Sequence, residues 1–337
     1  MSRQAVAEIT AILVSWRDVD DIEESVRSFA AARALARPGL RVSLVVVGNG
    51  PGSVRADRLR EIWPGALVIE NPHNRGFGPA ANQAAAAAAG DILLFLNPDT
   101  RAEKEPFTPL AEGFDERLDA VALAPRLADA SGEPVSPAGR RPLAPPSDED
   151  QFTFQLRRLP RLSSDARELL LWEHFRPDAP ARRRARYADE DRGHSFPVEQ
   201  AAGAALAVRT AAFRAIGGFD ESFVPAWFED VDLCARLAAR GLILYWPASV
   251  FRHAGGVSSQ RLGYDHFLPI LYANALRYRA KHYGRGSRVA YRALLAAGML
   301  LRLAALPFRP RPPRPRAEAA RAYSAVLRLT AGLGKRP

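Results

Sequence analysis

The sequence predicts an α/β protein built on a doubly wound, mostly parallel sheet. Between residues 11 and 96, short apolar runs alternate with segments of helical spacing. The apolar runs are nearly continuous, as in strands that are buried on both faces. Alternation of this kind is typical of parallel sheets with helices packed on each side.

The elements expected in the first third follow one another in this order. The strands are residues 11–14, 42–47, 66–69 and 92–96, and the helices are residues 18–35 and 80–89. The first helix carries Ile22, Val26 and Phe29 on one face, and Gly90 closes the second. Ligands of such sheets bind beyond the carboxyl ends of the strands, so Asn97-Pro98-Asp99 is well placed for chemistry.

The middle of the chain is expected to be an insertion, at about residues 129–197, into a main domain of residues 1–258. Residues 128–150 are rich in Pro, Ser and Asp and predict an irregular loop. Residues 151–175 predict helix with a break near Pro160, and the arginine-rich residues 181–192 are expected to be exposed. The main domain resumes at Val198, with strands at 204–208 and 242–245 and a helix at 230–240.

Residues 259–337 are expected to form a helical, basic C-terminal extension. Its most apolar stretch, Val289 to Phe308, is interrupted by Arg292 and Arg302, which disfavours a spanning helix. An interfacial amphipathic helix fits better, although packing on the main domain or a dimer contact are the alternatives. Residues 309–316 alternate Arg and Pro, as in a stiff extended connector.

Composition narrows the class of partner. The formal net charge of +10 and the pI near 10.3 favour nucleic acid, acidic lipid or phosphorylated substrates. Because no basic helix is interleaved with aromatic residues, we do not expect nucleic acid as a partner. The single cysteine, Cys234, excludes an intramolecular disulfide and is expected to be a buried structural thiol. No secretion signal is recognised, so a cytoplasmic location is expected.

Two polar groups suggest a cation site. Asp99 ends a buried strand, and its carboxylate can hold a hard divalent cation while a diphosphate completes the shell. His253 precedes a glycine pair and can supply an imidazole ligand. The alternatives are a Pro-Asp turn that only caps the strand and a structural histidine.

A glycine-bearing loop opens the helix that follows residue 76. In the segment from Asn74 to Asn82, backbone N–H groups at the helix start can receive a phosphate. The spacing does not match a dinucleotide-binding fingerprint, and an ordinary strand-to-helix turn is the alternative.

An acidic cluster opens the helix after residue 228. Glu229 and Asp230 both qualify as a general base, and a base works best with a raised pKa, whereas a helix N-terminus stabilises the anion. One carboxylate is expected to cap the helix while its neighbour, desolvated by Trp227 and Phe228, does the chemistry. The sequence leaves open which does which. Asp232 is expected to contribute helix-start electrostatics or to be a surface acid.

The order of these motifs resembles the family 2 glycosyltransferases of GT-A fold, and most closely their rhamnosyltransferase-like branch. The motifs are Asn74-Arg75-Gly76-Phe77-Gly78, Asn82, Asn97-Pro98-Asp99, residues 217–221, residues 229–233 and His253. The resemblance covers about Ala7 to Tyr283. It implies an inverting, metal-dependent transfer of a sugar from a nucleoside diphosphate.

The resemblance also implies roles for individual residues. Asp230 matches the catalytic base and Glu229 lies beside it, while Asp99 and His253 would bind Mg²⁺ or Mn²⁺. The donor is expected to contact the following residues: Ser15, Trp16, Asn49, Asn74, Gly76, Phe77, Asn82, Asn97 and Asp99. The chain departs from the family pattern at Gly48, where an acid is usual, at Ser15-Trp16-Arg17, and at Asn97, which replaces the first acid of the metal motif.

The function expected from this resemblance is hexosyl transfer, rhamnose favoured, in cell-envelope polysaccharide synthesis. The donor would be dTDP-rhamnose and the acceptor a glycan or a lipid-linked glycan. Peripheral contact with the inner face of the cell membrane would suit the basic extension. The alternative is a non-catalytic scaffold that binds nucleotide or carbohydrate, and the oligomeric state is open, with a dimer possible.

Overall fold

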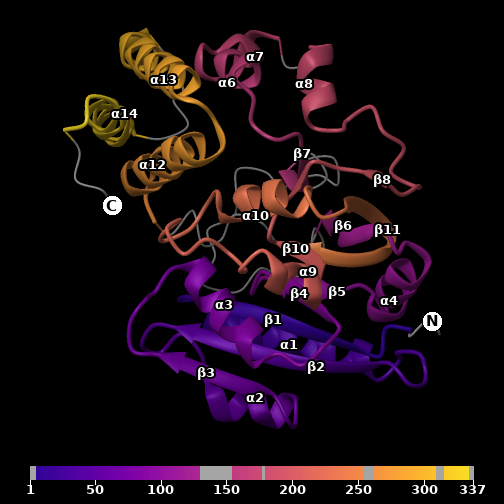
Figure 1. Ribbon diagram of the computed structural model, residues 1–337. Coiled ribbons are helices and arrows are strands. Elements are labelled where there is room, and N and C mark those ends of the chain that lie inside the picture. Colours follow the sequence, from indigo (N-terminus) through magenta and orange to yellow (C-terminus); the bar gives the residue numbers. More distant parts are fainter. Residues whose placement is uncertain (1–4, 130–153, 177–178, 254–261, 309–314, 334–337) are drawn as a thin grey trace.

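The protein is organised around one mixed sheet (Figure 1). The computed structural model describes residues 5–129, 154–176, 179–253, 262–308 and 315–333. Strands run in the order β3-β2-β1-β4-β10-β6-β11-β5, with β8 paired to β11, and β7 pairs with β9 in a small separate sheet. The strands are β1 Glu8–Ser15, β2 Arg41–Asn49, β3 Leu67–Asn71, β4 Ile92–Leu96, β5 Thr100–Ala102, β6 Ala120–Asp129, β7 Leu156–Arg157, β8 Phe196–Pro197, β9 Gln200–Ala201, β10 Ala205–Arg209 and β11 Leu242–His253.

Helices cover both faces of this sheet, which confirms the doubly wound architecture. One apolar cluster joins the sheet to α1 (Val19–Arg33), α2 (Ala56–Ile62) and α4 (Phe107–Glu116). A second cluster joins the opposite face to α3 (Phe77–Ala87), α9 (Thr210–Ala215) and α10 (Glu229–Leu237). Because apolar residues line both faces, the central strands are apolar along their whole length.

The elements expected in the first third are confirmed, but the sheet is more mixed than alternation alone suggests. Strands β3, β2, β1 and β4 are parallel, whereas β10 runs antiparallel to both β4 and β6. Strands β5 and β6 had no counterpart in the sequence analysis, and β11 extends well beyond the expected residues 242–245. This extension carries His253 to the edge where β4 ends.

The helix expected over residues 151–175 is interrupted at residues 156–157, where β7 pairs with β9, although Phe154 and Gln155 are helical. Gln155, fully buried, explains this: its amide donates to Pro125 O at 2.6 Å and accepts from Leu127 N at 3.2 Å. Tertiary bonds to β6 thus override the local helical preference. Helix follows later, in α6 (Leu162–Leu169), α7 (Trp172–Phe175) and α8 (Pro180–Ala185). The loop expected at 128–150 lies mostly outside the described residues.

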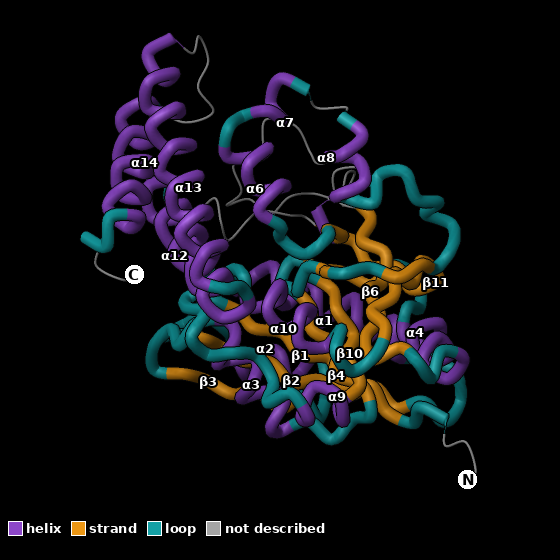
Figure 2. The backbone as a smooth tube through the Cα atoms, turned by 45° about the horizontal axis from the view of Figure 1, so that its top comes forward, coloured by secondary structure: helices purple, strands orange, loops and turns teal. Residues whose placement is uncertain are grey.

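The C-terminal extension is helical, as expected, and stacks with α6 as a separate layer (Figures 1 and 2). It contains α12 (Tyr264–His282), α13 (Arg285–Ala305) with a 3-10 turn at Leu306–Phe308, and α14 (Arg316–Thr330). A third apolar cluster, including Leu169, Leu295 and Tyr323, holds this layer together. The connector at 309–314 lies outside the described residues.

A buried ion pair joins the insertion to the extension. Arg279 on α12 is 1% exposed and pairs with Asp165 on α6. Burial raises the pKa of Asp165 to about 6, although the charge of Arg279 opposes that shift. The guanidinium also lies over the rings of Tyr283 and Tyr291, at 4.2 and 5.2 Å. The two segments therefore form one helical layer.

Replacing Arg279 should loosen this layer. The substitution Arg279→Met leaves the Asp165 carboxyl buried without its cation, and we expect the free energy of unfolding to fall by about 3 kcal/mol. Urea unfolding measures this. Arg60→Met, which removes an exposed ion pair with Asp57, is the control and should leave the midpoint nearly unchanged. Equal effects of the two substitutions would contradict this role of Arg279.

Candidate functional site

The end of β4 and the end of β11 bring the two predicted cation ligands together. His253 Nε2 lies 3.3 Å from Asp99 Oδ1 and 3.2 Å from Asn97 Nδ2. The pairing of β5 with β11 sets this position, because Thr100 stands opposite His253 in the register. His253 is 1% exposed, and the ring of Phe154 stacks on it at 6.1 Å.

This pair can supply part of a coordination shell. An imidazole nitrogen and a carboxylate oxygen suit Mg²⁺ or Mn²⁺. Within the described residues, no group of three or more His, Cys, Asp or Glu side chains is arranged to hold a metal. A cation bound here would therefore take its remaining ligands from substrate and water, as Mg²⁺ commonly does.

The acidic pair at the start of α10 lies in two different environments. Asp230 accepts hydrogen bonds from Gly203 N at 3.1 Å and from Val231 N at 2.8 Å. Glu229 is 7% exposed, and its Oε2 atom has no hydrogen-bond partner among the described residues. Burial raises the pKa of both carboxyls, while the backbone N–H groups and the charge of Arg157 hold that of Asp230 back.

These different environments indicate which of the two carboxyls acts as the proton acceptor, a question that the sequence left open. Two close carboxyls in a buried site do not both ionise readily, and hydrogen bonds to the charged form favour its ionisation. Asp230, which accepts from two backbone N–H groups, is therefore the member better placed to carry the charge and to accept a proton. Burial and the charge of Asp230 raise the pKa of Glu229, so Glu229 is the member better placed to hold a proton.

A short backbone segment links the acidic pair to the cation ligands. Gly203 N donates to Asp230, and the next residue, Ala204, accepts a hydrogen bond from Asn97 N at 3.1 Å. Gly203 also packs close to Asp230, since a Cβ added there would lie in van der Waals contact with Asp230 Cβ, at 3.7 Å. The chain between β9 and β10 thus sets Asp230 beside the end of β4.

The backbone that leads into the acidic pair is strained. Trp227 and Phe228 both have φ of +72°, a left-handed conformation that costs roughly 1–2 kcal/mol for each non-glycine residue. Asn274 of α12, fully buried, donates to Ala226 O at 2.9 Å and to Trp227 O at 3.0 Å. The Trp227 ring packs edge-on against Phe267, also on α12. The extension therefore holds the strained turn in place.

The aromatic residues before the acidic pair pack on α12. Trp227 contacts Phe267, and Phe228 packs near Tyr278, so both rings reach toward α12. Helix α3 also approaches Glu229, since a Cβ added to Gly78 would lie 3.9 Å from Glu229 Cβ. Close packing of α3 on the start of α10 contributes to the burial of Glu229.

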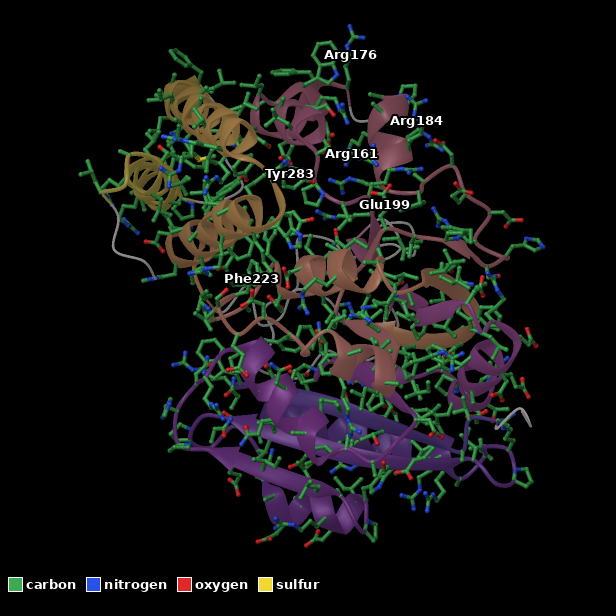
Figure 3. All side chains as sticks on the ribbon, in the orientation of Figure 1. Arg161, Arg176, Arg184, Glu199, Phe223 and Tyr283 are labelled. Atoms are coloured by element: carbon green, nitrogen blue, oxygen red, sulfur yellow. The ribbon has the colours of Figure 1, made fainter. Side chains whose placement is uncertain are left out.

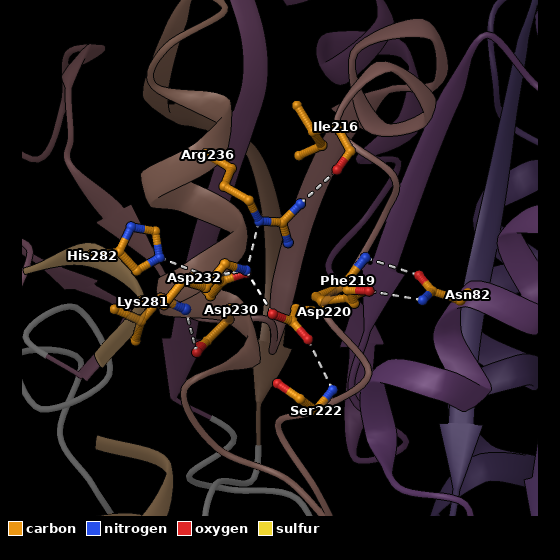
Figure 4. A network of polar contacts seen from close by, with 11 residues as sticks. Asn82, Ile216, Phe219, Asp220, Ser222, Asp230, Asp232, Arg236, Lys281 and His282 are labelled. Carbon is orange, nitrogen blue, oxygen red and sulfur yellow. Dashed lines mark hydrogen bonds and ion pairs between the residues drawn. The ribbon is translucent and has the colours of Figure 1, made fainter. Parts of the chain in front are cut away.

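Asp232 is fully buried, which contradicts the expectation of a surface acid. Its carboxylate binds Arg236 Nε at 2.7 Å, His282 Nε2 at 2.7 Å and Lys281 Nζ at 2.8 Å (Figure 4). Lys281 also pairs with Asp220 at 2.6 Å. Asp232 therefore ties α10 to the end of α12 and fixes the position of the helix that carries Asp230.

The glycine-bearing loop uses its backbone donors inside the protein. Arg75 N donates to Asn49 Oδ1 at 3.1 Å, Gly76 N to Asn74 Oδ1 at 2.8 Å, and Phe77 N to Pro225 O at 2.7 Å. Gly76 has φ of +93°, and a Cβ there would lie 2.9 Å from Val224. This geometry favours the strand-to-helix turn over a phosphate cradle at these N–H groups.

Several other residues that we expected to bind the donor form hydrogen bonds with neighbouring loops of the protein. Ser15 donates to Ser53 O at 2.8 Å, and the amide of Asn82 binds Phe219 through both its oxygen and its nitrogen. Asn49 is 2% exposed and bonds to the turn at Asn74 and Gly76. Asn74 is exposed, and Trp16 is half-buried with the Arg17 guanidinium 4.6 Å from its ring. Their contacts with a donor remain predictions.

The departure at Gly48 has a packing explanation. A Cβ at this position would lie 2.7 Å from a methyl carbon of Val54. The Val54 side chain therefore fills the space that an acidic residue would need, and Gly48 supplies no carboxylate to the site.

Asn274, Gly203 and Phe154 also contribute to the site, although no sequence pattern indicated them. Each acts through a partner far away in the chain, and none lies in a recognisable motif. The buried thiol predicted at Cys234 is confirmed: it donates to Ala201 O at 3.6 Å, and burial raises its pKa to about 12.

Comparison with known proteins agrees with this geometry. Residues 10–167 match the model of the family "Glycosyl transferase family 2". The chain is 27% identical, over 249 residues, to the N-acetylglucosaminyl-diphospho-decaprenol L-rhamnosyltransferase of Mycobacterium tuberculosis, covering 69% of this chain and 73% of the relative. It is 29% identical to the pre-mycofactocin glycosyltransferase of the same organism, over 64% of this chain and 37% of that protein.

The fold is also similar to that of a solved structure. The mannosyltransferase PcManGT from Pyrobaculum calidifontis, in complex with GDP-Man and Mn²⁺, has a TM-score of 0.52 at 14% identity, covering 98% of this chain and 87% of that one. The likeness confirms the predicted GT-A-type fold. The family match and the ordered motifs identify a family 2 glycosyltransferase domain in this chain, matched over residues 10–167.

Proposed function

We propose that this glycosyltransferase transfers a sugar, rhamnose favoured, from a nucleoside-diphosphate donor to a lipid-linked glycan, with inversion. The unequal acidic pair at Glu229 and Asp230 carries the catalytic part of the proposal. The name of the rhamnosyltransferase relative supports rhamnose as the sugar and a polyprenyl-diphosphate-linked acceptor. In the proposal the donor is dTDP-rhamnose and the pathway is cell-envelope glycan synthesis. A cytoplasmic location is also part of the proposal, and the single, buried Cys234 is compatible with it.

In the proposed reaction, the acidic pair acts on the acceptor, and Asp99 and His253 act on the leaving diphosphate. The acceptor hydroxyl oxygen attacks the anomeric carbon, the bond to the diphosphate breaks, and Asp230 takes the hydroxyl proton. Protonated Glu229 donates a hydrogen bond beside it and leaves the negative charge on Asp230. Asp99 and His253 would hold the Mg²⁺ or Mn²⁺ that neutralises charge on the leaving diphosphate.

A non-catalytic scaffold that binds nucleotide or carbohydrate is the second candidate, and one observation favours it. Position 48 lacks the carboxylate usual in the family, and Val54 closes the space. Turnover of nucleotide sugars with Mn²⁺ and a panel of acceptors distinguishes the two functions. A scaffold would bind donor without consuming it.

Removing the proposed base should abolish transfer while sparing donor binding. Asp230→Asn keeps the shape of the side chain but cannot accept the proton, so we expect kcat to fall by about 10²–10⁴-fold. Donor affinity from thermal shift should change little. Asp57→Asn, on the exposed face of α2, is the matched control. A full rate in the Asp230→Asn protein would exclude this base.

Transfer should require a divalent cation. We expect EDTA to stop turnover, Mn²⁺ to restore it, and Asp99→Asn to raise the Mn²⁺ concentration needed by at least about tenfold. The measurement is rate against Mn²⁺ concentration, with donor binding followed separately. Unchanged metal dependence in the Asp99→Asn protein would remove Asp99 from the cation site.

Loss of the Asn274 amide should disturb the acidic pair from a distance. Asn274→Leu leaves the carbonyls of Ala226 and Trp227 unpaired, costing about 1–3 kcal/mol of stability. Because the turn sets the burial of Glu229 and Asp230, we also expect kcat to fall about tenfold and the acid limb of the pH–rate profile to move. A stability loss with unchanged kcat and pH profile would limit Asn274 to a structural role.

A further inference from the structure

Helix α13 exposes an apolar face along its C-terminal half. Leu300, Leu301 and Phe308 are 58%, 41% and 86% exposed. The other exposed residues from position 293 onward are Ala293, Ala297, Ala304 and Pro307, and none of them is polar. A face this long and apolar is unusual on a soluble surface and marks an interaction site.

Arg302, which seemed to interrupt this stretch in the sequence, turns inward. Its guanidinium donates to Glu168 O at 3.1 Å and also binds Leu169 O, at the end of α6. The charge therefore caps the carbonyl end of α6 and leaves the apolar face continuous.

The insertion adds aromatic residues to the same end of the molecule. Gly298 packs directly on Leu169, so the residues after Leu169 begin beside α13. Leu170, Trp172 and Phe175 follow there and are 44%, 50% and 77% exposed. Figures 1 and 2 both place α6 and α7 at the same end of the molecule as α13. We call Leu170, Trp172, Phe175, Leu300, Leu301 and Phe308 the apolar end surface.

Positive charge borders this surface. The Arg176 guanidinium lies 5.0 Å from the Trp172 ring, and Figure 3 shows Arg176 and Arg184 at the same end of the molecule. Helix α13 contains no acidic residue, and it exposes Arg285, Arg288 and Arg292 in its N-terminal half. The nearby Glu173 lies within 4 Å of both Arg167 and Arg182. An anionic partner is therefore favoured over a neutral one.

We propose that the apolar end surface seats the protein on an anionic lipid bilayer, with exposed side chains of α7 and of the C-terminal half of α13 inserting at the interface. Exposed Trp and Phe side chains suit the headgroup region, and the flanking arginines suit acidic lipids. A second copy fits less well, because the same arginines would face one another. The proposal concerns attachment only and does not rest on the proposed reaction.

Attachment at the surface also fits the packing of α13 better than crossing. By length and composition, residues 285–308 are apolar enough to span a membrane. However, α13 packs against α6 on one side and against α12 and α14 on another. Crossing would also bury Arg285, Arg288 and Arg292 in hydrocarbon, which is costly.

Vesicle co-sedimentation of the full chain tests the proposal. We expect binding to vesicles of phosphatidylcholine mixed with phosphatidylglycerol, weaker binding to phosphatidylcholine alone, and weakening with added salt. The double variant Trp172→Gln/Phe175→Gln should bind at least about tenfold more weakly. The matched control is Leu35→Gln/Leu118→Gln, two exposed apolar residues on the α/β body, and it should bind like the natural sequence.

Three results would overturn the proposal. They are equal binding by the double variant and the natural sequence, loss of binding in the control alone, and a dimer in sedimentation velocity that the double variant dissociates. The last result would assign the surface to a second copy. Thermal unfolding verifies that each variant is folded. Because vesicle binding is measured without donor or acceptor, its failure is separable from failure of the proposed transfer activity.

Discussion

The buried pair of carboxyls at the start of α10, Glu229 and Asp230, is the constraint on which the rest of the site depends. Several parts of the structure hold this pair in place. Burying Glu229 and Asp230 costs free energy unless one of them keeps its proton. The Gly203 N–H and the positive charge of Arg157 stabilise the ionised form of Asp230, whereas Glu229 Oε2 has no partner among the described residues. The asymmetry of the pair therefore comes from its surroundings, because both side chains carry the same chemical group.

The helical layer maintains this arrangement from outside the sheet. Asn274 holds the left-handed turn at Trp227 and Phe228, and Lys281 and His282 bind Asp232 in the first turn of α10. The layer is itself fixed to the insertion through Arg279 and Asp165. In our proposals, the layer that positions the proposed base also carries the membrane-facing surface, which would orient the site toward a lipid-linked acceptor.

The parallel half of the sheet was predictable because its signals are local. Runs such as residues 92–96 are apolar throughout, and the helix at 80–89 is built from alanine, so pattern and propensity agree.

The prediction failed at β7, where Gln155 bonds to β6 across 30 residues of sequence. The motifs likewise indicated Asp99, His253, Glu229 and Asp230, but not Asn274, which lies 44 residues after Asp230 in sequence.

The sequence by itself determined the α/β class, the family and the identity of the candidate chemical groups, because apolar periodicity and ordered motifs are read along the chain. Tertiary structure alone decided that Asp230 is the better hydrogen-bonded acid, that Asp232 is buried, and that Arg302 turns away from the apolar face of α13. Each of these depends on which backbone donors, carbonyls and charges lie nearby in space. Burial and hydrogen bonding set the charge and direction of a side chain, and both are properties of the packed fold.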